Sequence, residues 1–144
     1  MHRMQGNDFI ASQMHTHGVS CFTCHDSHGS SNPSLLKKPA STLCLDCHGA
    51  GSANGPRAPS IEQHTHHAAG SPGNECIACH MPKIAQTIAD VNVRSHSFRF
   101  VGPALTESPQ VPNACNACHS DKSASWALEA LATWSDQSPW RMSR

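Results

Sequence analysis

Residues 112–121, "PNACNACHSD", contain two cysteines three positions apart and a histidine directly after the second cysteine. The same Cys-x-x-Cys-His frame occurs three more times in the chain of 144 residues. The four frames are residues 21–25, 44–48, 76–80 and 115–119. Together they use all eight cysteines of the chain, so any account of the fold has to begin with what these frames bind.

The histidine in a fixed position distinguishes among the chemistries of paired cysteines. Cys-x-x-Cys alone also occurs in zinc sites and redox dithiols, whereas Cys-x-x-Cys-His is the attachment sequence of a c-type haem. The two thiols hold the porphyrin, and the adjacent imidazole is the proximal iron ligand. We therefore predict four haem c groups. The predicted thioether cysteines are Cys21, Cys24, Cys44, Cys47, Cys76, Cys79, Cys115 and Cys118, and the predicted proximal ligands are His25, His48, His80 and His119.

Two other uses of eight cysteines fit the pattern less well. Paired zinc ribbons would take two Cys-x-x-Cys motifs for each metal ion, but they give the four fixed histidines no shared role. A framework of four disulfides suits a small exported chain, although regularly repeated Cys-x-x-Cys pairs are not needed for it. The frames favour haem over both.

The composition indicates a core that side chains alone do not fill. The chain has four Phe, three Trp and no Tyr, while ten Pro and nine Gly interrupt it often. A small domain with so few large apolar side chains usually needs a covalent or metal staple. We predict a single tetrahaem domain of residues 1–144 that is mostly irregular, with short α-helices and haems forming the core.

Charge and hydropathy exclude two classes of partner. Ten acidic and ten basic residues give a net charge of zero, and the chain has no basic run of the kind that binds nucleic acid. No stretch has the length of apolar sequence that a membrane span needs. We expect neither a nucleic acid partner nor a membrane span.

Eight histidines lie outside the frames and are candidates for the sixth iron ligand. They are His2, His15, His17, His28, His64, His66, His67 and His96. An iron used only for electron transfer takes a second axial ligand, so four haems could all be bis-His ligated. Met81 directly follows a proximal histidine and cannot reach the opposite face of that haem. All-His ligation is therefore the prediction.

Three regions supply the predicted distal ligands. His28 lies too close to His25 to reach the other side of the same haem, so we predict that it ligates a neighbouring one. His96 is the only candidate in its stretch of chain. In "HTHH", residues 64–67, one or two histidines are expected to ligate. His66 and His67 would point to opposite sides of an extended chain, so at most one would face a given haem.

The stretch before the first frame predicts a short helix over residues 8–17, "DFIASQMHTH". Ile10, Met14 and His17 share one face at the helical period, which favours His17 over His15 as a buried ligand.

A second helix is predicted over residues 122–135, with Asp121 or Ser123 as its N-cap. Its apolar stripe is Trp126, Ala127, Ala130, Leu131 and Trp134.

The runs "GVSCFTCHDSHG", "HTHHAAGSPGNECIACHMPK", "RSHSF" and "PNACNACHSDKSASWA" resemble multihaem cytochromes c of the doubled-CXXCH type. These are electron-transfer relatives of the cytochrome c554 and pentahaem nitrite reductase class, and the likeness extends from about Ser12 to Trp134. It implies a small multihaem cytochrome c fold with closely stacked haems. In such proteins a Ser-x-x-His before the first frame often supplies a distal ligand, which implies His15. The choice between His15 and His17 stays open.

The chain departs from the enzymes of that class in two ways. The nitrite reductases have a Lys in place of the proximal histidine at the active haem, whereas all four frames here end in His. Hydroxylamine-oxidising relatives depend on a tyrosine, and this chain has none. The resemblance therefore implies an electron carrier and no enzyme. The alternative is a multihaem enzyme that reduces a small nitrogen or sulfur oxyanion at one open haem.

Location and partners follow from the resemblance and from haem attachment, which takes place outside the cytoplasm. We expect a periplasmic or extracellular protein, although "MHRMQGNDFI" lacks the apolar region of a signal peptide, so the sequence is expected to be a mature or partial chain. Other redox proteins would be the electron donor and acceptor. Small tetrahaem cytochromes also form extracellular filaments. We hypothesise a homo-oligomer or filament with haem contacts between subunits, in which His2 or His17 is the donated ligand.

Overall fold

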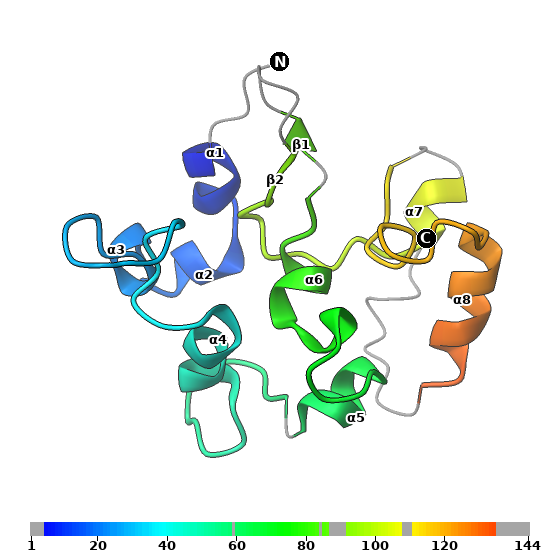
Figure 1. Cartoon of the computed structure of the whole chain (residues 1–144), viewed down its shortest axis with the longest axis horizontal. Coiled ribbons are helices and arrows are strands. Elements are labelled where there is room, and N and C mark those ends of the chain that lie inside the picture. Colours follow the sequence, from blue (N-terminus) through cyan, green and yellow to red (C-terminus); the bar gives the residue numbers. More distant parts are fainter. Residues whose placement is uncertain (1–4, 59, 84, 87–91, 108–110, 135–144) are drawn as a thin grey trace. The chain divides into compact units, whose positions relative to one another are not determined.

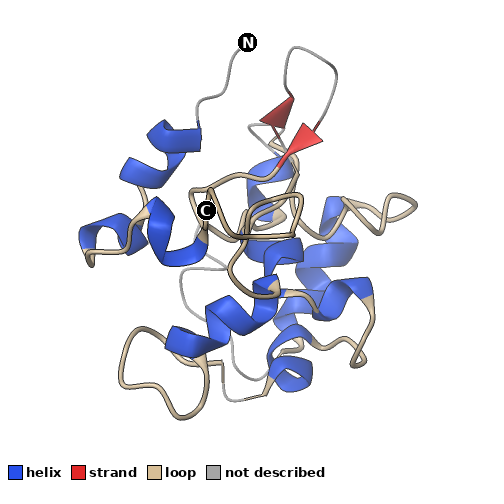
Figure 2. Ribbon diagram, turned by 60° about the vertical axis from the view of Figure 1, so that its left-hand side comes forward, coloured by secondary structure: helices blue, strands red, loops and turns tan. Residues whose placement is uncertain are grey.

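The computed structural model describes residues 5–58, 60–83, 85–86, 92–107 and 111–134, and within them it consists of short helices, long loops and a two-stranded sheet (Figures 1 and 2). The helices are α1 (Gln5–Ile10), α2 (Gln13–Thr16), α3 (Cys21–Cys24), α4 (Ala40–His48), α5 (Ile61–Thr65), the 3₁₀ helix η1 (Pro72–Asn74), α6 (Cys76–His80), α7 (Ala104–Glu107) and α8 (Ala124–Ala132). Strands β1 (Ala85–Gln86) and β2 (Asn92–Val93) pair antiparallel. The prediction of a mostly irregular fold with short α-helices is confirmed.

The chain forms two compact units. One comprises residues 13–77, and the other comprises residues 1–12 together with 78–144. The chain passes from the first unit to the second within α6. The single domain predicted for residues 1–144 stays a prediction. No helix in the described part of the chain is long and apolar enough to cross a membrane.

The predicted helix over residues 8–17 is wrong, because the chain breaks between α1 and α2. The N–H of Ser12 donates to the carbonyl of Phe9 at 2.9 Å, three residues back, which closes a tight turn. The Ser12 side chain is buried, at 1% exposure. Serine side chains compete with helical hydrogen bonds, so a serine is a common place for a helix to stop.

The break removes the basis for preferring His17. Ile10 ends α1 and is 61% exposed, so it does not begin a buried stripe. His17 lies one residue beyond the end of α2 at Thr16. The helical period therefore cannot place Ile10, Met14 and His17 on one face, and the structure leaves His15 and His17 as alternatives.

The last helix, α8, lies inside the predicted range of residues 122–135. Ser123 caps it, because its Oγ accepts a hydrogen bond from the N–H of Trp126 at 3.1 Å. Ala127 and Leu131 are each 1% exposed. Helix α7 packs on α8. The predicted end at residue 135 lies outside the described residues.

Few apolar side chains are buried in the described part of the chain. Besides the prolines Pro82 and Pro103, they are Phe9, Ala114, Ala127 and Leu131. All of them belong to the unit of residues 1–12 and 78–144, so the described residues of the 13–77 unit bury no apolar side chain. A unit of that size cannot be stable on polypeptide contacts of this kind alone. Something else has to supply its core.

Candidate haem sites

Each Cys-x-x-Cys-His frame forms about one helical turn. The first frame is helix α3 followed by His25, whose N–H donates to the carbonyl of Cys21 at 2.9 Å. The second ends α4, and the third is α6. In the fourth, a series of turns, the N–H of His119 donates to the carbonyl of Cys115 at 2.9 Å. Residues four apart on a helical turn share a side, so the first thiol and the imidazole of a frame lie next to each other.

None of the eight cysteines forms a disulfide, and each is exposed or half-buried. The chain therefore adopts no framework of four disulfides. Within the residues that the structure describes, no three His, Cys, Asp or Glu side chains come together as a group that could hold a metal ion. A structural zinc site needs four such ligands, so nothing in the geometry supports the zinc alternative. Haem attachment requires cysteines that are not joined in disulfides.

The imidazole of the first frame is oriented by a loop that folds back on it. His25 Nδ1 lies 2.9 Å from the carbonyl oxygen of Ser34. Because a carbonyl only accepts hydrogen bonds, Nδ1 carries the proton and Nε2 is the nitrogen with the lone pair. The loop is held by the N–H of Asp26 donating to the carbonyl of Leu35 at 2.8 Å and by the N–H of Lys37 donating to that of Cys24 at 3.0 Å.

The second frame has the same arrangement with a different loop. His48 Nδ1 donates to the carbonyl of Pro56 at 2.7 Å. The ring lies against Gly55, which has a left-handed φ of 68°. A Cβ atom at Gly55 would lie 2.7 Å from Cε1 of the imidazole. The N–H of Ala58 donates to the carbonyl of His48 at 2.8 Å, which closes the loop over the ring.

The thiols of the first three frames lie close enough to influence one another within the 13–77 unit. A hydrogen bond between Cys44 and Cys76 raises the pKa of the Cys44 thiol and lowers that of Cys76 to about 6. Burial, followed by the nearby Cys47, raises the pKa of Cys24. Burial also raises the pKa of Cys115 in the fourth frame. The attachment cysteines of the first three haems would therefore lie close to one another.

The fourth frame is held without a regular helix by two asparagines. Asn113 is 1% exposed, and its amide donates to Oγ1 of Thr106 at 2.8 Å and to Oδ1 of Asn116 at 2.7 Å. Asn116 in turn donates its amide to the carbonyls of His119 at 3.1 Å and Lys122 at 2.8 Å. These bonds add to the main-chain bond from His119 to Cys115, so the turn keeps its shape outside a regular helix.

Aromatic rings lie beside the proximal histidines of the last two frames. The centroids of His119 and Trp126 of α8 are 5.0 Å apart, with an angle of 52° between the rings. Those of His80 and Phe100 are 6.5 Å apart. Helix α8 thus places a tryptophan at the fourth frame.

Among the predicted distal ligands, His67 and His96 are half-buried and held through Nδ1. His67 Nδ1 donates to the carbonyl of Thr65 at 2.5 Å, and its ring lies directly on Gly73, where a Cβ atom would overlap it. His96 Nδ1 donates to Oε1 of Gln5 at 2.6 Å. Both imidazoles are thus oriented like those of the first two frames.

The other predicted distal ligands are exposed: His15, His17, His28 and His66. His66 has a left-handed φ of 55° and caps α5, so the chain is not extended there and the expected alternation with His67 is wrong. His28 lies in a turn closed by Asp26, whose carboxylate accepts from the N–H groups of His28 and Gly29, both at 3.1 Å. These two bonds lower the pKa of Asp26.

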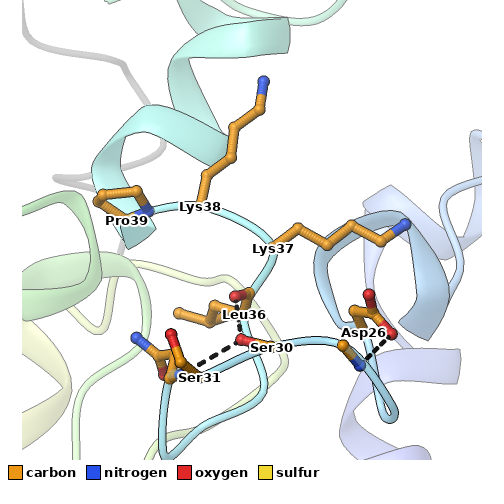
Figure 3. Close-up of a pocket in the computed structure, with 9 residues that line it drawn as sticks. Asp26, Ser30, Ser31, Leu36, Lys37, Lys38 and Pro39 are labelled. Atoms are coloured by element: carbon orange, nitrogen blue, oxygen red, sulfur yellow. Dashed lines mark hydrogen bonds between the residues drawn. The ribbon is translucent and has the colours of Figure 1, made fainter.

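A hollow of about 620 Å³ lies beside the first frame (Figure 3). Its lining residues are Asp26, Gly29, Ser30, Ser31, Asn32, Leu36, Lys37, Lys38 and Pro39. Figure 3 shows Ser30 among the residues that line the hollow. Its Oγ donates a hydrogen bond to the carbonyl of Leu36 at 2.6 Å. Leu36 and Pro39 are the apolar side chains of the lining. A porphyrin face needs more apolar surface than that, so we do not assign a haem to this hollow.

Sequence reasoning missed the groups that orient the histidines. Two of them are the main-chain carbonyls of Ser34 and Pro56, and every residue has a carbonyl, so no side-chain pattern marks them. Gly55 was visible as part of a turn signal, "NGP", but nothing indicated that a ring packs on it. Gln5 lies 91 positions from His96, too far for a local pattern to join them.

Comparison with known proteins agrees with this geometry. Residues 15–53, roughly a quarter of the chain, match the doubled CXXCH motif family and include the first two frames. The fold is similar to the crystal structure of outer cell wall cytochrome OcwA, with a TM-score of 0.57 and 20% sequence identity over 92% of this chain and 38% of that one. No curated protein matches. The chain thus contains a doubled CXXCH motif, and its fold is similar to that of a cytochrome. It spans 38% of the length of the solved structure that it resembles.

Proposed function

We propose that the chain is an electron carrier with four c-type haems, each held by two thioether bonds and a proximal histidine. The observation that carries the proposal is the fourfold one-turn frame, with no cysteine in a disulfide, in a chain whose 13–77 unit buries no described apolar side chain. Bound haem supplies one-electron exchange between ferric and ferrous iron. The porphyrins would also supply the apolar core that the polypeptide lacks.

The role of the chain is to orient imidazoles and to set their basicity. Where His25 and His48 donate Nδ1–H to a carbonyl, Nε2 keeps the lone pair and would be the nitrogen that holds the iron, and the imidazole becomes a stronger base. A stronger base stabilises the ferric form more than the ferrous form, which lowers the reduction potential. Ligation by histidine rather than methionine acts in the same direction.

For the distal positions we propose His96 and, within the 64–67 cluster, His67. Both are half-buried and oriented through Nδ1, whereas His66 is exposed at the end of α5. His28 and one of His15 and His17 complete the proposed set. His15, His17 and His28 are all exposed, so each of them could ligate a haem that is bound to another part of the chain or to another subunit.

We further propose an exported protein, periplasmic or extracellular, with other redox proteins as donor and acceptor. The location named for OcwA, the outer cell wall, supports export. A homo-oligomer or filament with haem contacts between subunits is an extension of the same proposal. In it the exposed His17 would ligate a haem of the next subunit. His2, the other candidate for that role, lies outside the described residues.

The test is an EPR spectrum of the ferric protein, with haem quantified per chain on the same sample. We expect four low-spin haems per chain. A high-spin signal in the unmodified protein would indicate an open iron and would move the assignment to an enzyme that reduces a small nitrogen or sulfur oxyanion. Absence of haem would overturn the proposal.

A matched pair of variants tests the choice within the cluster. His67→Ala should convert one haem from low-spin to high-spin, and the neighbouring His66→Ala should leave all four low-spin. The reverse result would assign the ligand to His66.

A further inference from the structure

His96 lies in a segment that is bound to the end of the third frame. Arg94 donates from Nη1 to the carbonyl of Met81 at 3.0 Å. The next N–H group, that of Ser95, donates to the carbonyl of Pro82 at 3.1 Å. These two acceptors directly follow the third Cys-x-x-Cys-His frame, so the segment is anchored to residues that the frame itself positions.

The other side of the segment is bound to α1. Oγ of Ser95 donates to Oδ2 of Asp8 at 3.1 Å, and the Ser95 side chain is 1% exposed. The ring of Phe98 meets that of Phe9 edge-on, with centroids 6.3 Å apart and an angle of 79°. A buried hydrogen bond and an aromatic pair therefore fix α1 against the segment, all within one compact unit.

The imidazole of His96 is held between these contacts. Its Nδ1 is 2.6 Å from Oε1 of Gln5 and 3.2 Å from the carbonyl of Arg94. The carbonyl can only accept, so Nδ1 carries the proton, and Gln5 faces it with its amide oxygen. The ring of Phe98 lies edge-on to the imidazole at 5.9 Å. Phe98 has a left-handed φ of 53°, a conformation that a bulky residue keeps only where its surroundings enforce it.

We propose that Gln5 is a positioning residue for iron ligation by His96. Its amide oxygen is the nearer of the two acceptors that face Nδ1–H, so with the carbonyl of Arg94 it keeps Nε2 as the ligating nitrogen, and it raises the basicity of the imidazole. It thereby lowers the reduction potential of one haem. The inference rests on the proposed function, because it takes His96 as a distal ligand. It adds a residue of α1 to the determinants of that haem's potential.

Two substitutions in the haem-loaded protein test the role of Gln5, with individual haem potentials resolved by redox titration. Gln5→Leu removes the nearer acceptor at similar size, leaves only the carbonyl of Arg94 at 3.2 Å, and should raise the potential of one haem. A tenfold loss of preference for the ferric form, at the low end of what such partners contribute to metal binding, corresponds to about 59 mV for a one-electron couple. Gln5→Glu offers a stronger acceptor and should lower the same potential. Opposite shifts at one haem would not follow from a purely structural role.

Gln13→Leu is the matched control, since it makes the same chemical change on an exposed side chain at the start of α2. It should leave every potential unchanged. His96→Ala separates the two proposals. If His96→Ala leaves all haems low-spin, His96 is not a ligand and its place in the proposed function fails. If it yields one high-spin haem while both Gln5 variants keep the original potentials, only the role of Gln5 is refuted.

Discussion

Ser34 and Pro56 each accept a hydrogen bond from a frame histidine through a main-chain carbonyl, and Gln5 does the same for His96 through its side chain. An imidazole fixed in this way needs little reorganisation when it binds iron. Partners of this kind typically change metal affinity by about 10- to 100-fold. At the scale of single residues, the proposed function therefore depends on loop geometry as much as on the frames.

Gly55 gives a direct test of that dependence. In Gly55→Ala the new Cβ would meet Cε1 of His48, and alanine would have to adopt a left-handed φ. We expect a loss of about 2 kcal/mol in unfolding free energy, measured by denaturant titration of the haem-loaded protein. The EPR g values of the second haem should also change, because the imidazole would turn.

Gly51→Ala is the control in the same loop, since a Cβ there has nothing within 4 Å. It should change the unfolding free energy by less than about 0.5 kcal/mol. Equal losses in the two glycine variants would show that His48 does not depend on its contact with Gly55.

The frames themselves could be predicted because five consecutive residues contain the whole signal. The orienting groups could not. The carbonyls of Ser34 and Pro56 accept because of where the loops fold, and folding back depends on main-chain bonds such as that from Asp26 to Leu35. The choice of His67 over His66 likewise depends on a left-handed residue at the end of α5, which no hydrophobic period indicates.

At the scale of elements, α8 and the N-terminal helices show when a periodic pattern of apolar residues is sufficient to predict a helix. In α8 two signals predict the same helix. Ser123 marks its start as the cap, and the apolar stripe includes the buried residues Ala127 and Leu131. Before the first frame, the pattern of Ile10 and Met14 suggested a helix, but the turn at Ser12 interrupts it. A short amphipathic pattern without a second signal is a weak basis for a helix.

The cap of α8 can be tested because Ser123 accepts the N–H of Trp126, and Trp126 lies beside His119. Ser123→Ala should lower the unfolding free energy by about 1 kcal/mol. Ser123→Asp keeps an acceptor at the cap and should retain most of the stability. Thermal unfolding of the two variants and the original protein measures the difference. Equal destabilisation by Ala and Asp would mean that the cap contributes nothing and that the hydroxyl is needed for another contact.

At the scale of the whole molecule, the two compact units differ in what they bury. The unit of residues 1–12 and 78–144 contains all the buried apolar side chains of the described residues, including Phe9 and Leu131. The 13–77 unit contains two complete frames and the first cysteine of a third, Cys76. If porphyrins are the core, the 13–77 unit should depend on haem more strongly than the unit of residues 1–12 and 78–144.

That difference leads to a prediction about the protein before haem is attached. Produced where no haem is attached, the chain should show no cooperative thermal transition, because apolar burial cannot offset the entropy of ordering its loops. The exported, haem-loaded protein should unfold cooperatively. Circular dichroism of both forms, with thiols kept reduced, measures this. Hydrogen exchange would locate the difference, with residues 13–77 exchanging fastest in the haem-free form. A cooperative transition in the haem-free chain would mean that side-chain contacts are sufficient and that haem is not the core.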